Sequence, residues 1–207
     1  MLEKLPPTLG HGLRDTRAGL EHVLFNRIDL RGGTGAIAVR SLAFADHAPI
    51  PALYTADGDG VSPPIEWTGV PSTAVALVLV VEDADSPTPM PLVHAIVTDL
   101  AAGDGQLAEG AIDKASDAAQ DATIGRNSYL RRGWLPPDPP PGHGVHRYAF
   151  QLFALGPGDD LGSVPGREAV LALLEARAIA SGMLIGTYAR GDGTLPVRDS
   201  RAAVAGP

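Results

Sequence analysis

Two apolar runs joined by a proline-rich acidic loop constrain the fold of this chain more than any other stretch. They lie at 75–81 and 92–97. The first run is nearly continuous in Val, Leu and Ala, which is typical of a strand covered on both faces. The loop between the runs has prolines at 87, 89 and 91, and neither a helix nor a central strand accommodates such a series. This stretch therefore predicts two core strands with a rigid connection.

Polar residues mark the ends of these two runs. Glu82, Asp83 and Asp85 follow the first run, and His94 interrupts the second. An aspartate after a strand often caps a turn, and a lone histidine in a strand is often a satisfied core residue. A connection between two core strands nevertheless needs neither this series of prolines nor the clustered carboxylates. We therefore expect this loop to form part of a functional rim.

The composition indicates one domain with a sizeable core, since 44% of the 207 residues are hydrophobic. A formal net charge of −8 argues against nucleic acid and anionic membrane surfaces as partners. The absence of cysteine excludes disulfides, zinc-thiolate sites and thiol nucleophiles. The N-terminus lacks the apolar segment of a secretory signal, and no apolar run is long enough to span a membrane. We expect a cytoplasmic protein.

The remaining pattern predicts further strands separated by long loops rich in proline and glycine. These strands lie at 36–41, 65–67, 147–155 and 183–188. A parallel α/β fold would need helices that alternate with the strands, whereas helices are indicated only near the two ends. The sequence therefore predicts an all-β fold, an antiparallel β-sandwich with peripheral N- and C-terminal helices.

The two expected helices are amphipathic. The N-terminal helix would place Leu13, Leu20, Val23 and Leu24 on one face, which should dock on the body or on a second copy of the chain. The C-terminal helix should begin after Gly166 and end at Gly182, with one apolar face that comprises Val170, Leu171, Leu174 and Ala178.

Three segments are expected along the chain. They are an N-terminal helical extension at 1–35, a β-sandwich domain at 36–190 and a flexible polar tail at 191–207. The glycine cluster at 32–35 would act as a hinge. It is a weak phosphate cradle, because no strand precedes it and no Gly-Lys-Ser/Thr follows.

Asp83, Asp85, His94, His146 and Tyr148 lie at or near the ends of the apolar runs, and three chemistries are open to them. Two histidines and two aspartates can hold a divalent metal, but their spacing gives no HxH or HxxxH pair. A nucleophilic triad needs a positioned hydroxyl, and neither Ser62 nor Ser86 lies in a G-x-S-x-G turn. The third possibility is a small-molecule site built from imidazoles, a tyrosine hydroxyl and loop N–H groups.

Five motifs in order resemble the phosphatidylethanolamine-binding protein family, and most closely its bacterial Raf kinase inhibitor-like branch. They are YTADGDGVSPPIEW (54–67), VEDADSP (81–87), LVHAIV (92–97), PPPGHGVHRYAFQLFAL (139–155) and MLIGTYAR (183–190). The resemblance covers about 36 to 190 and implies a β-sandwich with a small cavity for phosphate-like anions and phospholipid head groups.

The resemblance also implies roles for individual residues. Those matched to the ligand cavity are Asp83, Asp85, Pro87, His94, His146 and Tyr148. The loops that brace it are represented by Asp57, Gly58, Ser62 and Pro63, and the glycine loop with Gly142 and Gly144 would supply N–H donors. The chain departs from the family at Ala84 and Ser86, where the motif has proline and alanine. It also has Leu92-Val93 in place of an aromatic residue, which softens one wall of the pocket.

These observations predict a non-enzymatic protein with one anion pocket, without cofactor or metal. A carboxylate such as Asp83 would repel a phosphate unless the ligand has an ammonium group facing it, or unless Asp83 holds a histidine protonated. In the latter case His94 and His146 would be cationic donors. Two other functions stay open: a kinase or protease inhibitor-like regulator that docks a phosphorylated partner, and a hydrolase that uses the histidines and aspartates. The family resemblance also makes a homodimer an expectation.

Overall fold

The computed structural model describes residues 6–30, 35–112, 122–159 and 164–191. Ten strands lie in these ranges: β1 Gly35–Ala36, β2 Ala38–Arg40, β3 Ala48–Pro49, β4 Ile65–Thr68, β5 Ala76–Asp83, β6 Leu92–Leu100, β7 Gly105–Leu107, β8 Thr123–Ile124, β9 His146–Leu155 and β10 Ala178–Tyr188. The helices are α1 Pro7–Gly12, α2 Leu24–Arg27 and α3 Arg167–Arg177, with 3-10 turns η2 Leu20–His22 and η3 Ala52–Tyr54.

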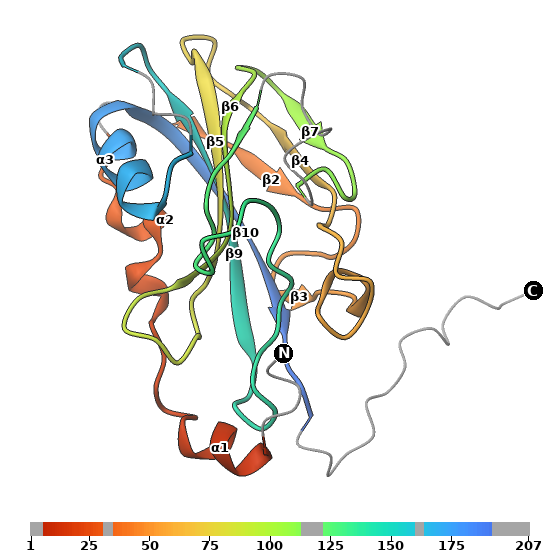
Figure 1. Cartoon of the computed structure of the whole chain (residues 1–207). Helices are drawn as coiled ribbons and strands as arrows, with labels where there is room; N and C mark the ends of the chain where they lie inside the picture. The colour runs from red at the N-terminus through yellow and green to blue at the C-terminus, as the bar shows by residue number, and fades with distance from the viewer. Residues whose placement is uncertain (1–5, 31–34, 113–121, 160–163, 192–207) are drawn as a thin grey trace, which may run out of the picture.

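The strands form two open sheets (Figure 1). The larger sheet has the order β1-β10-β9-β5-β6-β8, with β3 also paired to β10, and the smaller sheet has the order β2-β4-β7. The four long strands β10, β9, β5 and β6 are antiparallel, and only the two-residue strands β1 and β3 pair with β10 in parallel. The predicted antiparallel β-sandwich is confirmed.

The central strand β5 is covered on both faces, as its continuous apolar sequence predicts. Leu77, Leu79 and Val81 belong to the core between the two sheets. The alternate residues Val78 and Val80 pack in a second cluster with apolar side chains of α3 and α2. In Figure 1, α3 and α2 accordingly lie on the opposite side of the large sheet from β2, β4 and β7.

The predicted N-terminal helix over 13–24 is wrong. The chain instead forms α1, an extended segment, η2 and α2. Gly19 has a φ of 95°, and the N–H groups of Ala18 and Gly19 donate to the carbonyls of Ser86 and Ala84. Hydrogen bonds to the body thus replace the helical ones. Residues 7–27, called the N-terminal arm below, bury Val23 and Leu24 completely, so the expected docking on the body is confirmed for these two residues, whereas Leu13 and Leu20 are only half-buried.

The predicted helix end at Gly182 is also wrong, because α3 ends at Arg177 and Gly182 lies inside β10. A Cβ atom at Gly182 would lie 1.9 Å from the carbonyl oxygen of Ile37. The glycine therefore permits the close approach of the segment after β1, whose Ile37 N–H donates to the Ser181 carbonyl. The single strand predicted at 36–41 is split in the same region between β1 of the large sheet and β2 of the small one.

Other expectations fall partly outside the described residues. The hinge at 32–35 and the tail beyond Gly191 are in this class, so the predicted boundaries of the three segments stay predictions. Of the helices in the described ranges, none has the length and apolarity needed to cross a membrane.

Candidate functional site

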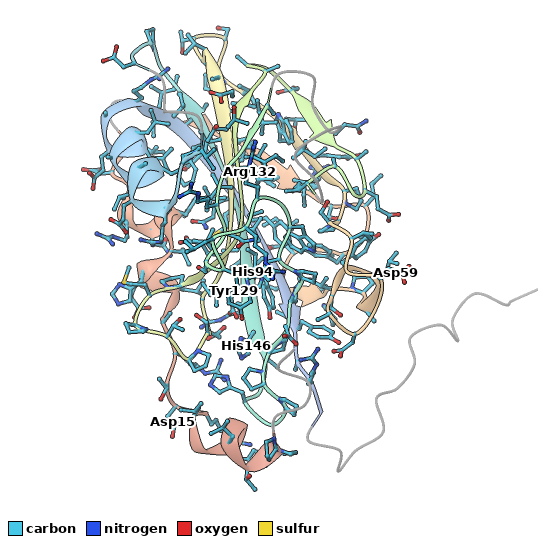
Figure 2. The ribbon with its side chains drawn as sticks, viewed as in Figure 1. Asp15, Asp59, His94, Tyr129, Arg132 and His146 are labelled. Carbon is cyan, nitrogen blue, oxygen red and sulfur yellow. The ribbon has the colours of Figure 1, made fainter. Side chains whose placement is uncertain are left out.

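The register of the large sheet brings the predicted site residues to one end of it. Asp83, the last residue of β5, pairs with Leu92 of β6 on one side and with Tyr148 of β9 on the other. His94 lies two residues after Leu92, and His146 two residues before Tyr148, so each shares a face with its neighbour. Figure 2 shows His94 and His146 near each other at this end, with Tyr129 beside them.

A small cavity of about 40 Å³ lies between these strand ends and the loop before β9. One water molecule needs roughly 10–15 Å³ of such space, so the cavity suits a group the size of one phosphate. The lining consists of three polar or charged side chains near strand ends, four prolines and several loop residues: Asp83, Ser86, Pro87, Leu92, His94, Tyr129, Leu135, Pro136, Asp138, Pro139, Pro140 and His146.

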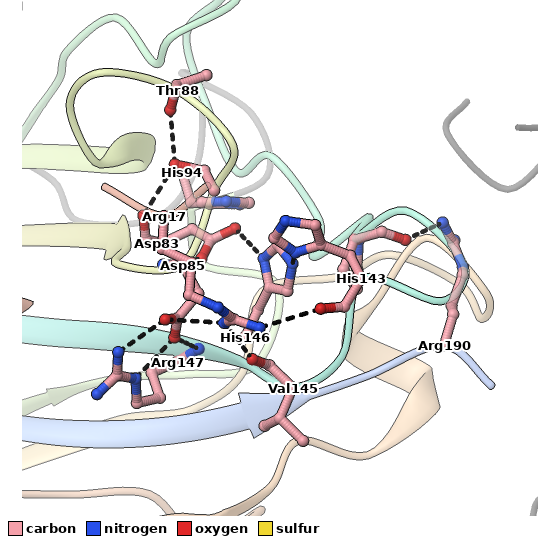
Figure 3. A network of polar contacts seen from close by, with 12 residues as sticks. Arg17, Asp83, Asp85, Thr88, His94, His143, Val145, His146, Arg147 and Arg190 are labelled. Carbon is pink, nitrogen blue, oxygen red and sulfur yellow. Dashed lines mark hydrogen bonds and ion pairs between the residues drawn. The ribbon is translucent and has the colours of Figure 1, made fainter. Parts of the chain in front are cut away.

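A chain of hydrogen bonds runs from Asp83 away from the cavity (Figure 3). His146 Nδ1 is 2.8 Å from Asp83 Oδ2, and its Nε2 is 2.7 Å from Nδ1 of His143. His143 Nε2 in turn donates to the Leu13 carbonyl at 2.8 Å. Burial and the charge of His146 lower the pKa of His143, which therefore has a single ring proton, on Nε2. Every hydrogen bond of this series has a donor and an acceptor when His146 carries an N–H on both nitrogens and forms an ion pair with Asp83.

His94 has the opposite character. Burial lowers its pKa, and the charge of Asp83 offsets only part of that effect. The ring is therefore neutral near pH 7, and its Nδ1–H donates to the Leu135 carbonyl at 2.5 Å. Nε2 is left as a bare, buried acceptor, and none of the residues that the structure describes donates to it. The expectation that His94 is a cationic donor is thus not met, because the desolvation of its ring outweighs the nearby carboxylate.

Tyr148 lies behind the cavity rather than in its lining. Its ring meets that of His94 edge-on at 5.1 Å and lies 6.4 Å from that of His146. Burial, with the charge of Asp83, raises the pKa of Tyr148 well above its usual value, so the phenol keeps its proton. Its hydroxyl is fully buried and has no hydrogen-bond partner among the described residues. Two orphaned polar atoms, the His94 acceptor and the Tyr148 hydroxyl, therefore belong to neighbouring rings at this strand end.

Asp85 does not line the cavity, although the resemblance matched it to the ligand site. Arg147 donates to it from the backbone N–H, Nε and Nη2, and Arg17 Nη1 lies 2.9 Å from Oδ1. Burial alone would raise the pKa of Asp85, but these hydrogen bonds outweigh it and lower the pKa. The Arg17 guanidinium also donates to the Val145 and His143 carbonyls, so Asp85 fastens the N-terminal arm to the loop before β9.

The predicted supporting residues lie outside the cavity lining and brace it indirectly. Asp57 accepts hydrogen bonds from Tyr188 and Arg190, and Arg190 also binds Asp138 of the cavity wall. Gly58, Ser62 and Pro63 stabilise nearby turns and loops. A Cβ at Gly58 would lie 2.2 Å from the Ala52 carbonyl, and Ser62 Oγ accepts from the Ile112 N–H beside buried Pro63.

Gly142 and Gly144, which were expected to donate to the ligand, are also absent from the lining. Both have positive φ angles, 79° and 99°. A Cβ at Gly142 would lie 2.8 Å from the His11 ring, so this glycine lets α1 approach the loop.

Sequence reasoning missed Ser86, Tyr129 and Asp138 as lining residues, and His143, Arg17 and Arg190 as their supports. Tyr129 and Asp138 belong to the loop NSYLRRGWLPPDPPPGHG, which the sequence identified only as a long proline-rich connection. The density of prolines in this loop was the available signal, because three of them, Pro136, Pro139 and Pro140, line the cavity. Among the residues that the structure describes, no group of three or more His, Asp or Glu side chains is arranged to hold a metal ion.

The family model for the phosphatidylethanolamine-binding protein matches residues 40–189, which include every cavity residue. The chain belongs to the phosphatidylethanolamine-binding protein family. A relative from Methanothermobacter thermautotrophicus, named UPF0098 protein, is 35% identical over 153 residues, 74% of this chain and 99% of the relative. LppC of Mycobacterium tuberculosis, which is named as a candidate lipoprotein, is 36% identical over 154 residues, 73% of this chain and 72% of the relative.

Solved structures agree with this family assignment. A phosphatidylethanolamine-binding protein homolog from Chlamydia trachomatis has a TM-score of 0.66 and 34% identity, over 76% of this chain and 99% of the other. YbcL of Escherichia coli has a TM-score of 0.69 over 74% of this chain and 98% of the other. Its identity is 24%, so this second likeness shows the fold alone. The N-terminal arm precedes the matched residues, and it is therefore an addition to the family's common core.

Proposed function

We propose that this protein is a non-enzymatic binding protein whose cavity takes a phosphate-like group, either free or as part of a phospholipid head group. The observation that carries the proposal is His94 Nε2, a buried acceptor without a partner among the described residues, on a side chain that lines a cavity of about 40 Å³. A buried polar atom without a partner is costly, and a ligand that donates to it recovers that cost. Family membership supports the same class of ligand.

The charges around the cavity restrict the form of the ligand. Asp83 and Asp138 line it as carboxylates, and His94 presents an acceptor. Both ring nitrogens of His146 are already engaged, with Asp83 and with His143. A fully ionised phosphate would therefore face acceptors, whereas a monoprotonated phosphate can donate its own P–O–H to His94 Nε2. A zwitterionic head group can instead direct its ammonium toward Asp83.

The cavity hydroxyl offers little support for hydrolysis. Ser86 Oγ donates to the Asp83 carbonyl at 3.2 Å and lies 2.7 Å from Thr88 Oγ1. Its oxygen is thus held by the turn that contains it, and none of its hydrogen bonds among the described residues involves a histidine. A nucleophilic serine needs a base within hydrogen-bond reach. This arrangement favours a binding role over the hydrolase.

Titration calorimetry with methyl phosphate and methyl sulfate tests the proposal. The second proton of a phosphate monoester dissociates with a pKa of about 6, whereas the sulfate ester has none at these pH values. If the ligand donates its proton to His94, the affinity for methyl phosphate should fall about tenfold per pH unit above about 6, since only the monoanion binds. Methyl sulfate should bind about fivefold to 150-fold more weakly at pH 6, because an unmatched buried acceptor costs about 1–3 kcal/mol.

Equal affinities for the two esters would contradict the donated proton, and no binding of either ester, or of phosphoethanolamine, would overturn the cavity as a phosphate site. A cytoplasmic location and a homodimer belong to the same proposal. Fractionation of cells and light scattering of the purified protein test them, and membrane-bound protein or a monomeric mass would refute each in turn.

A further inference from the structure

A second, larger hollow lies directly beside the cavity. This groove has a volume of about 730 Å³, within the range of roughly 300–1,000 Å³ that is usual for small-molecule sites. It is lined mainly by the proline loop before β6 and by the loop after β8: Thr88, Pro89, Met90, Pro91, Leu92, Val93, Arg126, Asn127, Ser128, Tyr129, Leu130, Val164, Gly166 and Arg167. Leu92 and Tyr129 line both spaces, so the groove begins where the cavity ends.

Large apolar side chains are exposed in this groove. Met90, Tyr129 and Leu130 are 37%, 47% and 78% exposed. The loop that presents them is firmly held, because the side-chain oxygen of buried Asn127 accepts from the N–H groups of Tyr129 and Arg131. Leu130 even has a φ of 59°, a conformation that leucine rarely adopts. A rigid loop that holds leucine out toward water indicates a surface that is built to be covered.

The polar groups of the groove favour a hydrocarbon chain over a peptide as its occupant. Pro87 at the cavity and Pro89 and Pro91 along the groove have no N–H to donate. The carbonyls of a bound peptide would therefore lose their water partners at this edge without replacement, whereas a hydrocarbon needs none. The charged residues that line the groove are Arg126 and Arg167, and Arg167 is already paired with buried Glu82 at 2.7 Å. Their sign disfavours a cationic occupant of the groove.

We propose that this groove binds the hydrocarbon chain of a single-chain amphiphile whose phosphate-like head occupies the cavity. The proposal rests on the proposed function and deepens it, since it assigns the ligand class to alkyl phosphates and related lipids with one chain. The ester oxygen of such a molecule leaves the cavity between Leu92 and Tyr129, and its chain then lies along Met90, Leu130 and Val164.

A series of alkyl phosphates from methyl to octyl, each below its micelle concentration, tests this assignment by calorimetry at pH 6. Each methylene buried in the groove should lower the dissociation constant about threefold to fourfold, until the groove is filled. Octyltrimethylammonium is the matched control for unspecific binding of an alkyl chain. It should bind far more weakly than octyl phosphate, because its head group cannot replace the phosphate and has the charge of the two arginines.

Leu130→Asn is the sharpest variant. Asparagine adopts a positive φ more readily than leucine, so the loop should keep its shape while it loses apolar surface. The affinity for octyl phosphate should fall about tenfold, since several buried methylenes lose their contact. Leu42→Asn removes an equally exposed leucine, 79% exposed and absent from the groove, and it should change nothing.

The outcomes separate this proposal from the proposed function. If methyl phosphate binds but the affinity is independent of chain length, the groove assignment fails and the cavity stands. If no ester binds at all, both fail. A dimer in solution that Leu130→Asn dissociates, together with an absent chain-length effect, would show that the groove is covered by a second copy of the chain and would overturn the proposal.

Discussion

Asp83 and Asp85 lie two residues apart in one turn, yet the two sides of that turn differ in how their charges are used. Asp85, which is 1% exposed, lies between the N-terminal arm and β9, and its two oxygens bind Arg17 of the arm and the side chain and backbone N–H of Arg147 in β9. Asp83 faces the cavity, where it is paired with a single imidazole, that of His146. The turn itself is closed by the Asp85 N–H, which donates to Asp83 Oδ1.

This contrast separates a structural carboxylate from a carboxylate available to a ligand. The hydrogen-bond capacity of Asp85 is taken up by the protein, so it can fasten the arm but has little left for a ligand. Asp83 and His94 both line the cavity, so a bound head group would meet the Asp83 carboxylate and the unpartnered His94 Nε2 together. The two acids of this turn therefore have different roles: Asp85 holds the arm in place, and Asp83 is available to a ligand.

The largest effect is expected from Asp85→Asn, which should destabilise the fold while the remaining folded protein still binds methyl phosphate. Breaking a buried charge pair costs on the order of 3 kcal/mol, a value that solvent screening reduces here because Arg147 is about one-third exposed. Urea denaturation at pH 7 measures the loss. Asp59→Asn, at an exposed aspartate, is the control and should change stability by less than about 0.5 kcal/mol.

The same substitution has a signature in acid. The pKa of Asp85 is lowered in the folded state, so its stabilisation is present above the unfolded value of about 3.9 and is lost as pH falls through the folded value. The difference in stability between the wild type and Asp85→Asn should therefore shrink below about pH 4. A difference that is constant from pH 7 to pH 3 would contradict the structural role of this carboxylate.

Asp83→Asn should have the smaller effect on folding and the larger effect on ligand choice. An ammonium that faces this carboxylate forms a charged hydrogen bond of about 1.5–3 kcal/mol. The variant should therefore lose about tenfold more affinity for phosphoethanolamine than for methyl phosphate, as calorimetry on both proteins would measure. Equal losses for the two ligands would show that Asp83 orients His146 without contacting the head group.

The sequence was sufficient for the part of the molecule that depends on strand pattern. The apolar runs of β5 and β6 and the apolar pattern of β9 predicted the core strands, and the polar residues at or near their ends pointed to the cluster that Asp83, His94 and His146 form. The arm could not be predicted in this way, because hydrogen bonds of Ala18 and Gly19 with distant residues override the helical pattern. For the same reason Gly182 was misread, since the close approach of Ile37 is not visible in local sequence.

The protonation states of the histidines at the cavity could not be predicted from the sequence either. A histidine beside an aspartate predicts a raised pKa, yet His94 is so deeply buried that desolvation prevails. The sequence pattern also gave no signal that the ring of His143, three residues before His146, bonds His146 Nε2. Loop geometry determines such contacts, so they became apparent only from the folded chain.

Nitrogen NMR of the histidine rings at pH 7 tests the central claim most directly, because it reads the protonation of each ring nitrogen. We expect His94 to be neutral with its proton on Nδ1, facing the Leu135 carbonyl, and His146 to carry protons on both nitrogens between Asp83 and His143. His94→Gln and His146→Gln assign the two signals. A cationic His94, or a His146 with one bare nitrogen, would contradict the account of a cavity that accepts the proton of its ligand.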